Sequence, residues 1–213
     1  MVTASRLERR DREKLARRND ILRAAREIFA TRGYRDATLD EIAQRAAFAK
    51  GTLYNYFQSK EQIFDQILDS VLAEVIALSA DALRGGDSLR EKLRRHARAL
   101  IMYFKANEDF LKIVAREMNR MLFDNQRAEV EQIRARVMRI HAALKRVLEV
   151  EMKHHRVRNV NPDVLAHLFS EMIHIRTIRC LFVPKGMESL DPEKEAEFLV
   201  DLFLDGVAVH SAG

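Results

Sequence analysis

The chain has 213 residues, of which 47% are hydrophobic and 32% charged, enough to bury one substantial core or two modest ones. Only 7 glycines and 3 prolines interrupt it, and no stretch alternates in the manner of a strand, so we predict an all-α fold of about nine helices. The single cysteine, Cys180, excludes an intramolecular disulfide and a cysteine-rich zinc site, and the lack of an apolar leader or membrane span leads us to expect a cytoplasmic protein.

The net charge of +5 is unevenly distributed along the chain. Residues 1–60 hold 14 Lys and Arg against 8 Asp and Glu, whereas residues 61–213 hold 23 against 24. A basic segment joined to a nearly neutral one is the electrostatic pattern of a nucleic-acid-binding domain attached to a domain with another task. We therefore expect two domains, covering residues 1–60 and 61–213.

Residues 1–18 form a basic arm with seven cations against three acids. One interpretation is a frayed, solvated arm. The other is an arm that orders on DNA and adds phosphate or minor-groove contacts. An anionic membrane surface is a third possible partner, but the arm has too few apolar residues to favour it.

The next segment reads as two short helices joined by a tight corner. A helical apolar stripe that ends at Gly33 precedes them. Thr38 followed by Glu41 is a capping box, which predicts a helix start. After a corner at 46–49, a second helix carries Leu53 and Phe57 inward at i and i+4. This spacing predicts a helix-turn-helix over residues 38–57.

The outward residues of the second helix have the chemistry of a DNA interface. Lysine ammonium groups pair with phosphates, and short hydroxyl and amide side chains reach phosphates or base edges. Two short amphipathic helices are also common in all-helical proteins that bind no DNA, so it is these side chains that favour recognition. The outward residues are Lys50, Thr52, Tyr54, Asn55, Tyr56 and, at the next helix, Lys60.

The same residues resemble the DNA-binding signature of the tetracycline-repressor (TetR) family. The matching runs are Thr-Leu-Asp-Glu-Ile-Ala-Gln-Arg-Ala at 38–46, Lys-Gly-Thr-Leu-Tyr-Asn-Tyr-Phe at 50–57, Ser-Lys-Glu at 59–61, and Phe64. The resemblance is strong over residues 20–68. It implies that Thr38 and Lys60 hold phosphates and that Lys50, Gly51 and Thr52 meet bases or backbone. Tyr54, Asn55 and Tyr56 are then expected to lie along the recognition helix.

Two residues depart from the family pattern. The family usually has Gly where this chain has Ala47, and often Ser or Thr where it has Ala49. If the turn residue is left-handed, Ala there costs about 1 to 2 kcal/mol. Ala49 offers no capping oxygen, a loss of about 1 kcal/mol.

The rest of the chain divides into further helices at recognisable start and stop signals. Ser59 with Gln62 and Ser88 with Glu91 read as capping boxes, and Asn161-Pro162 and Asp191-Pro192 as N-caps followed by proline. The helices that we expect cover residues 59–83, 88–107, 109–121, about 125–154, 161–182 and 191 onward. The helix from residue 59 links the two domains, so any ligand effect on DNA passes along it or around it.

The helix at 161–182 and the final helix are apolar over more than one face, which requires two sets of partners. We expect the domain core to supply one set and a second copy of the chain the other, in a four-helix interface. The family resemblance implies a homodimer as well. On the final helix we assign Phe198, Leu199, Leu202 and Phe203 to the core stripe and place Val200 and Leu204 outside it.

One face of the helix at 161–182 carries a polar set, His167, Glu171 and His174. It is either a solvated surface, an anchor for the head group of a ligand, or a weak candidate for a metal site. A further metal ligand, such as His96 or His141, cannot be placed from sequence. The residues that we predict to bind a ligand are Met102, Phe110, Met118, Ser170, Glu171, His174 and Thr177, because methionines and aromatics suit variable apolar molecules.

These patterns lead us to expect a ligand-responsive transcriptional regulator. By the family resemblance it is a repressor, released from a pseudo-palindromic operator by a small, largely apolar effector, with no cofactor. The alternative is a TetR-like DNA-binding protein whose C-terminal domain binds a protein partner instead. No nucleophile elbow, phosphate loop, zinc-protease or paired-cysteine motif is present, so we do not expect an enzyme.

Overall fold

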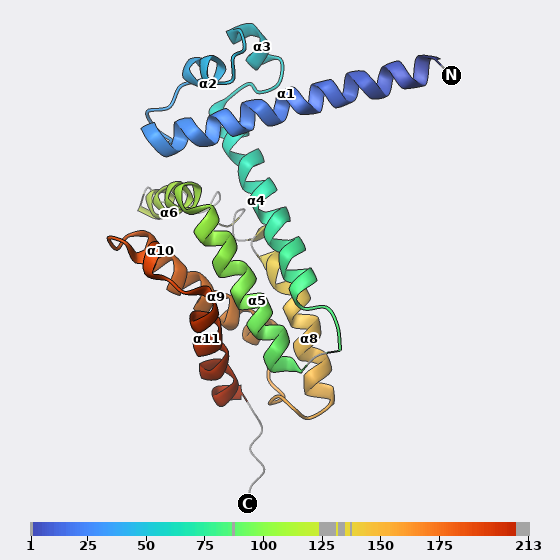
Figure 1. Ribbon diagram of the computed structural model, residues 1–213, viewed down its shortest axis with the longest axis vertical. Helices are drawn as coiled ribbons and strands as arrows, with labels where there is room; N and C mark the ends of the chain where they lie inside the picture. Colours follow the sequence, from blue (N-terminus) through green and yellow to red (C-terminus); the bar gives the residue numbers. More distant parts are fainter. Residues whose placement is uncertain (1, 87, 124–130, 132–134, 137, 208–213) are drawn as a thin grey trace, which may run out of the picture. The chain divides into compact units, whose positions relative to one another are not determined.

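The computed structural model describes residues 2–86, 88–123, 131, 135–136 and 138–207 (Figure 1). These residues form ten α-helices and a 3-10 turn, which confirms the all-α fold. The helices are α1 (Val2–Arg32), α2 (Leu39–Arg45), α3 (Lys50–Tyr54), α4 (Lys60–Ala82), α5 (Leu89–Ala106), α6 (Glu108–Phe123), α8 (Ala142–Lys153), α9 (Pro162–Leu181), α10 (Gly186–Ser189) and α11 (Pro192–Val207), and the turn η1 is Arg139–His141. None of the described helices is long and apolar enough to cross a membrane.

The chain divides into two compact units, an N-terminal unit of residues 1–71 and a C-terminal unit of residues 72–213. The division falls between Val71 and Leu72, inside α4, whereas the sequence-based boundary lies at residue 60. α4 therefore contributes its first half to one unit and its second half to the other.

The N-terminal unit is built on α1, a single helix of 31 residues that includes the basic arm. The arm is exposed along residues 8–17, whereas Ile21, Ala25 and Phe29 are fully buried against the rest of the unit. Gly33 ends the helix with φ +83° and donates its N–H to the carbonyl oxygen of Phe29 at 3.0 Å. The predicted apolar stripe and its left-handed cap are confirmed.

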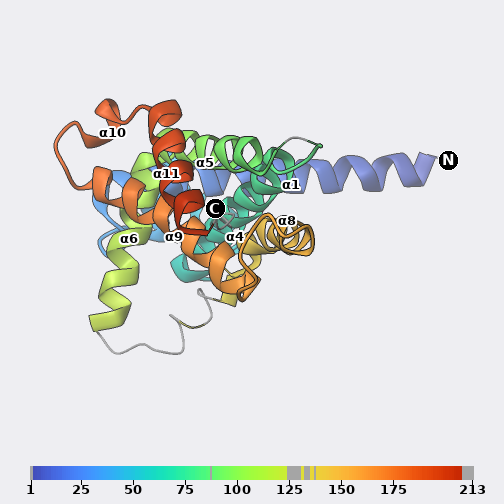
Figure 2. The same ribbon diagram turned by 90° about the horizontal axis from the view of Figure 1, so that it is seen from below.

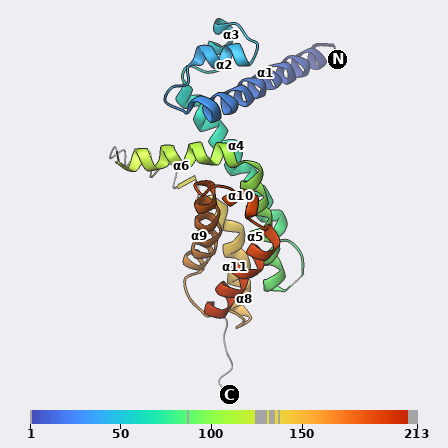
Figure 3. The same ribbon diagram turned by 60° about the vertical axis from the view of Figure 1, so that its left-hand side comes forward.

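α9 is the central helix of the C-terminal unit, because it contacts α5, α6, η1, α8, α10 and α11 (Figure 2). α11 packs along α5, and α8 lies on another side of α9. Figure 3 shows α6 crossing the direction of α5, α8 and α11. Fully buried residues in this interior include Leu93, Ile101, Leu144, Leu148 and Phe169.

The predicted helix starts of this unit are confirmed. The Ser88 hydroxyl accepts the N–H of Glu91, and the Asn161 side chain accepts the N–H of Asp163. The Asp191 carboxylate accepts the N–H of Glu193 at 3.0 Å. These caps satisfy helix amides that would otherwise lack partners.

Two segments differ from the sequence-based expectation. The long helix expected from about 125 to 154 includes the 3-10 turn at 139–141, and its residues 124–130, 132–134 and 137 lie outside the described part of the chain. The short helix α10 was not predicted. It begins at Gly186, where a Cβ atom would lie 2.4 Å from the carbonyl oxygen of Cys180, so only glycine lets the chain pass this close to α9.

Candidate functional site

Thr38 closes the start of α2 through both halves of its capping box. Its hydroxyl accepts the N–H of Glu41 at 3.2 Å, and its own N–H donates to the Glu41 carboxylate at 3.0 Å. These hydrogen bonds from Thr38 hold the pKa of Glu41 below its usual value. Thr38 remains exposed, as a phosphate contact requires.

The corner between α2 and α3 is a left-handed turn made by alanine. Ala47 has φ +57°, and the N–H of Phe48 donates to the carbonyl oxygen of Ala43 at 2.9 Å. This is the bond pattern that normally places glycine at the left-handed position. Ala49 is the N-cap of α3, and its side chain makes no capping bond. Both departures from the family pattern therefore fall where they remove stabilisation.

α3 ends at Tyr54, earlier than the predicted residue 57, and it is anchored by a buried residue within it and by another just after its end. Leu53 is 0% exposed and Phe57 is 1% exposed, which confirms the predicted inward pair. The residues predicted to contact DNA are all accessible. Lys50, Gly51, Tyr54 and Asn55 are exposed, and Thr52 and Tyr56 are partly exposed. The helix-turn-helix thus presents a cationic and polar face on a fixed apolar support.

Lys50 is paired with Asp40 across the helix-turn-helix. The lysine Nζ lies 2.8 Å from the Asp40 Oδ2, and both side chains are 60% exposed. The hydrogen bond to Asp40 raises the pKa of Lys50, so the ammonium stays charged. The best-placed cation of the recognition face is therefore shared with a carboxylate when no DNA is bound.

Lys60 lies under the loop that leads into α2. Its Nζ donates to the carbonyl oxygens of Tyr34, Arg35 and Ala37 at 3.1, 2.6 and 3.3 Å. It also lies 5.0 Å from the centroid of the Tyr34 ring, which packs in turn against Phe64 at 5.0 Å. The contact of Lys60 with a DNA phosphate stays a prediction. If Lys60 makes this contact, its ammonium group must bind the phosphate while it also holds the three loop carbonyls.

Sequence reasoning did not assign Arg18, which braces the N-terminal unit. Its guanidinium donates to the Gln66 side chain at 2.7 Å and lies 5.4 Å from the centroid of the Phe57 ring. Arg45 pairs with Glu27 in a similar way and joins α2 to α1. Such long-range partners leave no periodic signal in the sequence.

In the C-terminal unit, three histidines approach one another from separate elements. His96 on α5 is 1% exposed, and His141 in η1 is 5% exposed. The ring of His141 lies 5.1 Å from that of His167 on α9. Burial lowers the pKa of His96 to about 4, so its imidazole is neutral at physiological pH. Sequence analysis named His96 and His141 without placing them.

The predicted ligand residues do not all share this interior. Phe110 and Ser170 are buried, Glu171 is partly buried, and His174 is exposed with its Nδ1 3.6 Å from the Glu171 carboxylate. The side chain of Met118 lies outside the described residues.

Two of the predicted ligand residues are placed less favourably than the others. Met102 is 45% exposed, because Ile101 fills the inward position beside it on α5. The hydroxyl of Thr177 already donates to the carbonyl oxygen of Ile173 at 2.7 Å, so it has no free donor for a ligand.

No metal site is assembled by the weak candidate set. Among the described residues, no group of three or more His, Cys, Asp and Glu side chains is arranged to hold a metal ion. His174 is exposed, and its Nδ1 faces the Glu171 carboxylate.

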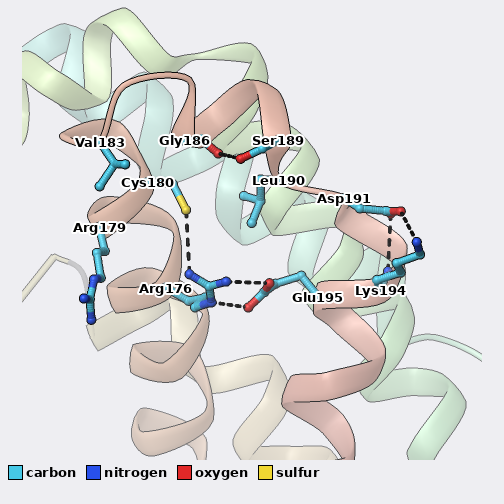
Figure 4. Close-up of a pocket in the computed structure, with 10 residues that line it drawn as sticks. All are labelled: Arg176, Arg179, Cys180, Val183, Gly186, Ser189, Leu190, Asp191, Lys194 and Glu195. Carbon is cyan, nitrogen blue, oxygen red and sulfur yellow. Dashed lines mark hydrogen bonds and ion pairs between the residues drawn. The ribbon is translucent and has the colours of Figure 1, made fainter.

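A surface pocket of about 420 Å³ lies where α9, α10 and α11 meet (Figure 4). The guanidinium of Arg176 lies inside it and pairs with the Glu195 carboxylate at 2.5 and 3.1 Å. The same guanidinium is 3.8 Å from the Sγ of Cys180. The guanidinium of Arg176 is therefore already engaged within the pocket.

An exposed apolar stripe runs along α9 and α11. On α9 it follows spacings of four and seven residues, and on α11 a spacing of four. Its members and their exposed fractions are Val164 52%, Leu168 50%, Ile175 63%, Phe182 50%, Phe198 57% and Leu202 56%. The assignment made for α11 from sequence is corrected here, because Val200 is 1% exposed and faces the core while Phe198 and Leu202 face outward.

Comparisons with known proteins match this geometry. Residues 21–67 match the family model of bacterial regulatory proteins of the tetR family. The activator FasR of Mycolicibacterium smegmatis is 32% identical over 121 residues, 57% of this chain and 52% of that protein. The repressor KstR2 of Rhodococcus jostii is 35% identical over 80 residues, 38% of this chain and 39% of that protein. The chain thus spans about half or less of the length of these curated relatives.

Similarity to a solved structure covers more of the chain than the similarity to these relatives. The TetR family transcriptional regulator PfmR of Thermus thermophilus superimposes with a TM-score of 0.68 at 26% identity, covering 87% of this chain and 97% of that one. Residues 21–67 therefore carry the helix-turn-helix domain of the TetR family of bacterial regulators, and the helical fold of the chain is similar to that of a TetR family transcriptional regulator.

Proposed function

We propose that the protein binds an operator in double-stranded DNA with the outer face of α3 and thereby represses transcription. The observation that carries this proposal is the division of residues 50–57, with Leu53 and Phe57 buried and the cationic and polar side chains accessible. Such side chains bind phosphates and read base edges. FasR is named an activator and KstR2 a repressor. We favour repression because it requires only that the operator be occupied.

The proposed operator-binding form is a homodimer joined through α9 and α11. Six large apolar side chains exposed on two adjacent helices form a face that water disfavours, and a second copy covers it with the same residues. A dimer of this kind places two recognition helices about 34 to 36 Å apart, which matches half-sites one turn of DNA apart.

Light scattering of two matched variants tests the dimer. Leu168→Glu places a charge in the proposed interface and is expected to give a monomer. Leu15→Glu changes a leucine of α1 that is 57% exposed, and this variant is expected to remain dimeric. A stable wild-type monomer at low concentration would contradict the proposal.

We further propose that a small molecule bound in the C-terminal unit releases the operator by population shift. DNA favours one separation of the two recognition helices, and the effector favours another. α4 supports such coupling because it is one continuous helix that contributes to both units. Only an effector with different affinity for the two states can shift them.

Selection from a random DNA pool tests the operator proposal, because the operator sequence is unknown. Wild-type protein is expected to enrich a pseudo-palindrome. Lys50→Ala and Tyr56→Ala are expected to abolish enrichment while dimerisation and helical content stay unchanged. Enrichment of no sequence by the wild type, or unchanged enrichment by both variants, would refute the role of α3.

A further inference from the structure

Polar atoms without a hydrogen-bond partner gather in the interior of the C-terminal unit. Both ring nitrogens of His96, the Nδ1 atoms of His141 and His167, and the hydroxyl of Ser170 are buried with no partner among the described residues. His96, His141 and Ser170 are 1%, 5% and 7% exposed. We call these four residues the buried polar cluster.

The cluster comes from three elements, α5, η1 and α9, and both α5 and η1 pack against α9. His96 stacks on Phe169 with centroids 6.2 Å apart and an interplanar angle of 27°. His167 and Ser170 lie three residues apart on α9 and therefore on the same face. Phe169 thus holds the His96 ring in place, while the polar atoms named above stay unmatched.

Unmatched buried polar atoms are uncommon in folded proteins. Roughly 90% or more of buried backbone polar groups, and most buried side-chain polar atoms, have a partner in protein or ordered water. Here five such atoms occur in four residues that come from separate parts of the chain. Each buried polar atom without a partner lowers the free energy of unfolding, so apolar side chains at these positions would give a more stable core. The cluster is therefore explained best by a hydrogen-bonding partner that is not part of the chain.

We propose that the buried polar cluster binds the hydroxyl or carbonyl group of an uncharged effector whose remaining body is apolar. This inference rests on the proposed ligand-responsive function and names the chemistry of its ligand. A neutral imidazole offers one donor and one acceptor, and Ser170 offers both. An alcohol or a ketone matches this set.

The charges around the cluster select against ionic head groups. Glu171 acts electrostatically on His141, and its own pKa is lowered chiefly by the neighbouring His174 imidazole, so its carboxylate is ionised at neutral pH. An anionic head group would meet this carboxylate. A cationic one would have to lose its hydration beside His96, where burial already keeps the imidazole neutral.

Four compounds with the same chain length test the head-group chemistry on the full-length protein. The probes are 1-octanol, octanoate, octylammonium and octane, each added at equal concentration near pH 7. 1-Octanol at ten times its dissociation constant is expected to raise the melting temperature by about 3 to 6 °C, from mass action. An equal or larger shift with octanoate, octylammonium or octane, or no shift with 1-octanol, would overturn the proposal.

Three variants separate the cluster from ordinary core packing. His96→Leu removes two unmatched nitrogens, so it is expected to melt no lower than wild type and to lose the octanol shift. Ser170→Ala is expected to reduce the shift. The matched control is Thr177→Val on the same helix, whose hydroxyl is already bonded to Ile173. It is expected to melt lower and to keep the shift. A destabilised His96→Leu, or one that retains the shift, would refute the site.

Operator binding measured in the same samples separates this inference from the proposed function. If the wild type binds its operator but shows no octanol shift, the buried polar cluster is not the ligand site. If octanol stabilises the wild type and not His96→Leu, yet leaves operator affinity unchanged, the site is supported and the release mechanism is refuted.

Discussion

Replacing Ala47 with glycine is expected to stabilise the N-terminal unit. Ala47 has φ +57°, a left-handed conformation that costs an alanine about 1 to 2 kcal/mol and a glycine almost nothing. Glycine also gives the unfolded chain more freedom, which offsets about 0.4 to 1 kcal/mol. Because Ala47 is exposed, its methyl group takes little packing with it. The net expectation is a stabilisation of about 0.5 to 1 kcal/mol.

Hydrogen exchange of the α2 and α3 amides measures this effect in the unit that contains the turn, and denaturant unfolding measures it in the whole protein. The neighbouring residue provides a matched control. Ala46 has φ −79°, so Ala46→Gly relieves no strain and is expected to destabilise by about 0.5 to 1 kcal/mol. If Ala47→Gly destabilises by the same amount as Ala46→Gly, the argument from backbone strain fails.

Three further predictions follow from the same geometry. Ala49→Ser places a hydroxyl at an N-cap whose backbone is already extended, and it should raise the free energy of unfolding by about 1 kcal/mol, whereas an unchanged value would contradict the capping argument. Asp40→Asn removes the carboxylate that pairs with Lys50, so it should raise the affinity for random DNA several-fold and make that affinity depend more steeply on salt. The control Asp36→Asn removes the same charge elsewhere and should change the affinity and its salt dependence less. His96 binds a proton more readily when unfolded, since its pKa falls from 6.5 to about 4 on folding. The stability that comes from keeping His96 neutral is therefore fully present above pH 6.5 and is lost as the pH falls towards 4. Lowering the pH to 4 should reduce the free energy of unfolding, measured by urea titration, by up to about 3 kcal/mol. The variant His96→Leu should not show this loss.

Lys60 has a role inside the protein as well as the phosphate contact predicted for it. It binds three carbonyl groups of the loop before Thr38, and so positions the capping box at the start of α2. The sequence signature alone assigns it to a phosphate. Only the packing of α4 against the loop shows that its ammonium is already engaged.

The sequence by itself determined the local features of this protein. Helix starts at Thr38, Ser88 and Asn161, and the helix end at Gly33, depend on side chains within a few residues of the backbone groups that they satisfy. The same holds for the inward pair of α3, because helical periodicity places Leu53 and Phe57 on one face. Because these interactions join residues that are close in the sequence, they can be predicted without knowing the tertiary structure.

The tertiary structure alone decided the contacts between distant residues. α11 is apolar over more than one face, so its sequence could not show that Val200 faces the core and Phe198 faces outward. Packing against α5 made that choice. His96 and the histidines at 141 and 167 lie far apart in the sequence, and only the fold brings them together. Their unmatched nitrogens are a consequence of burial, which depends on every surrounding element and leaves no local pattern in the sequence.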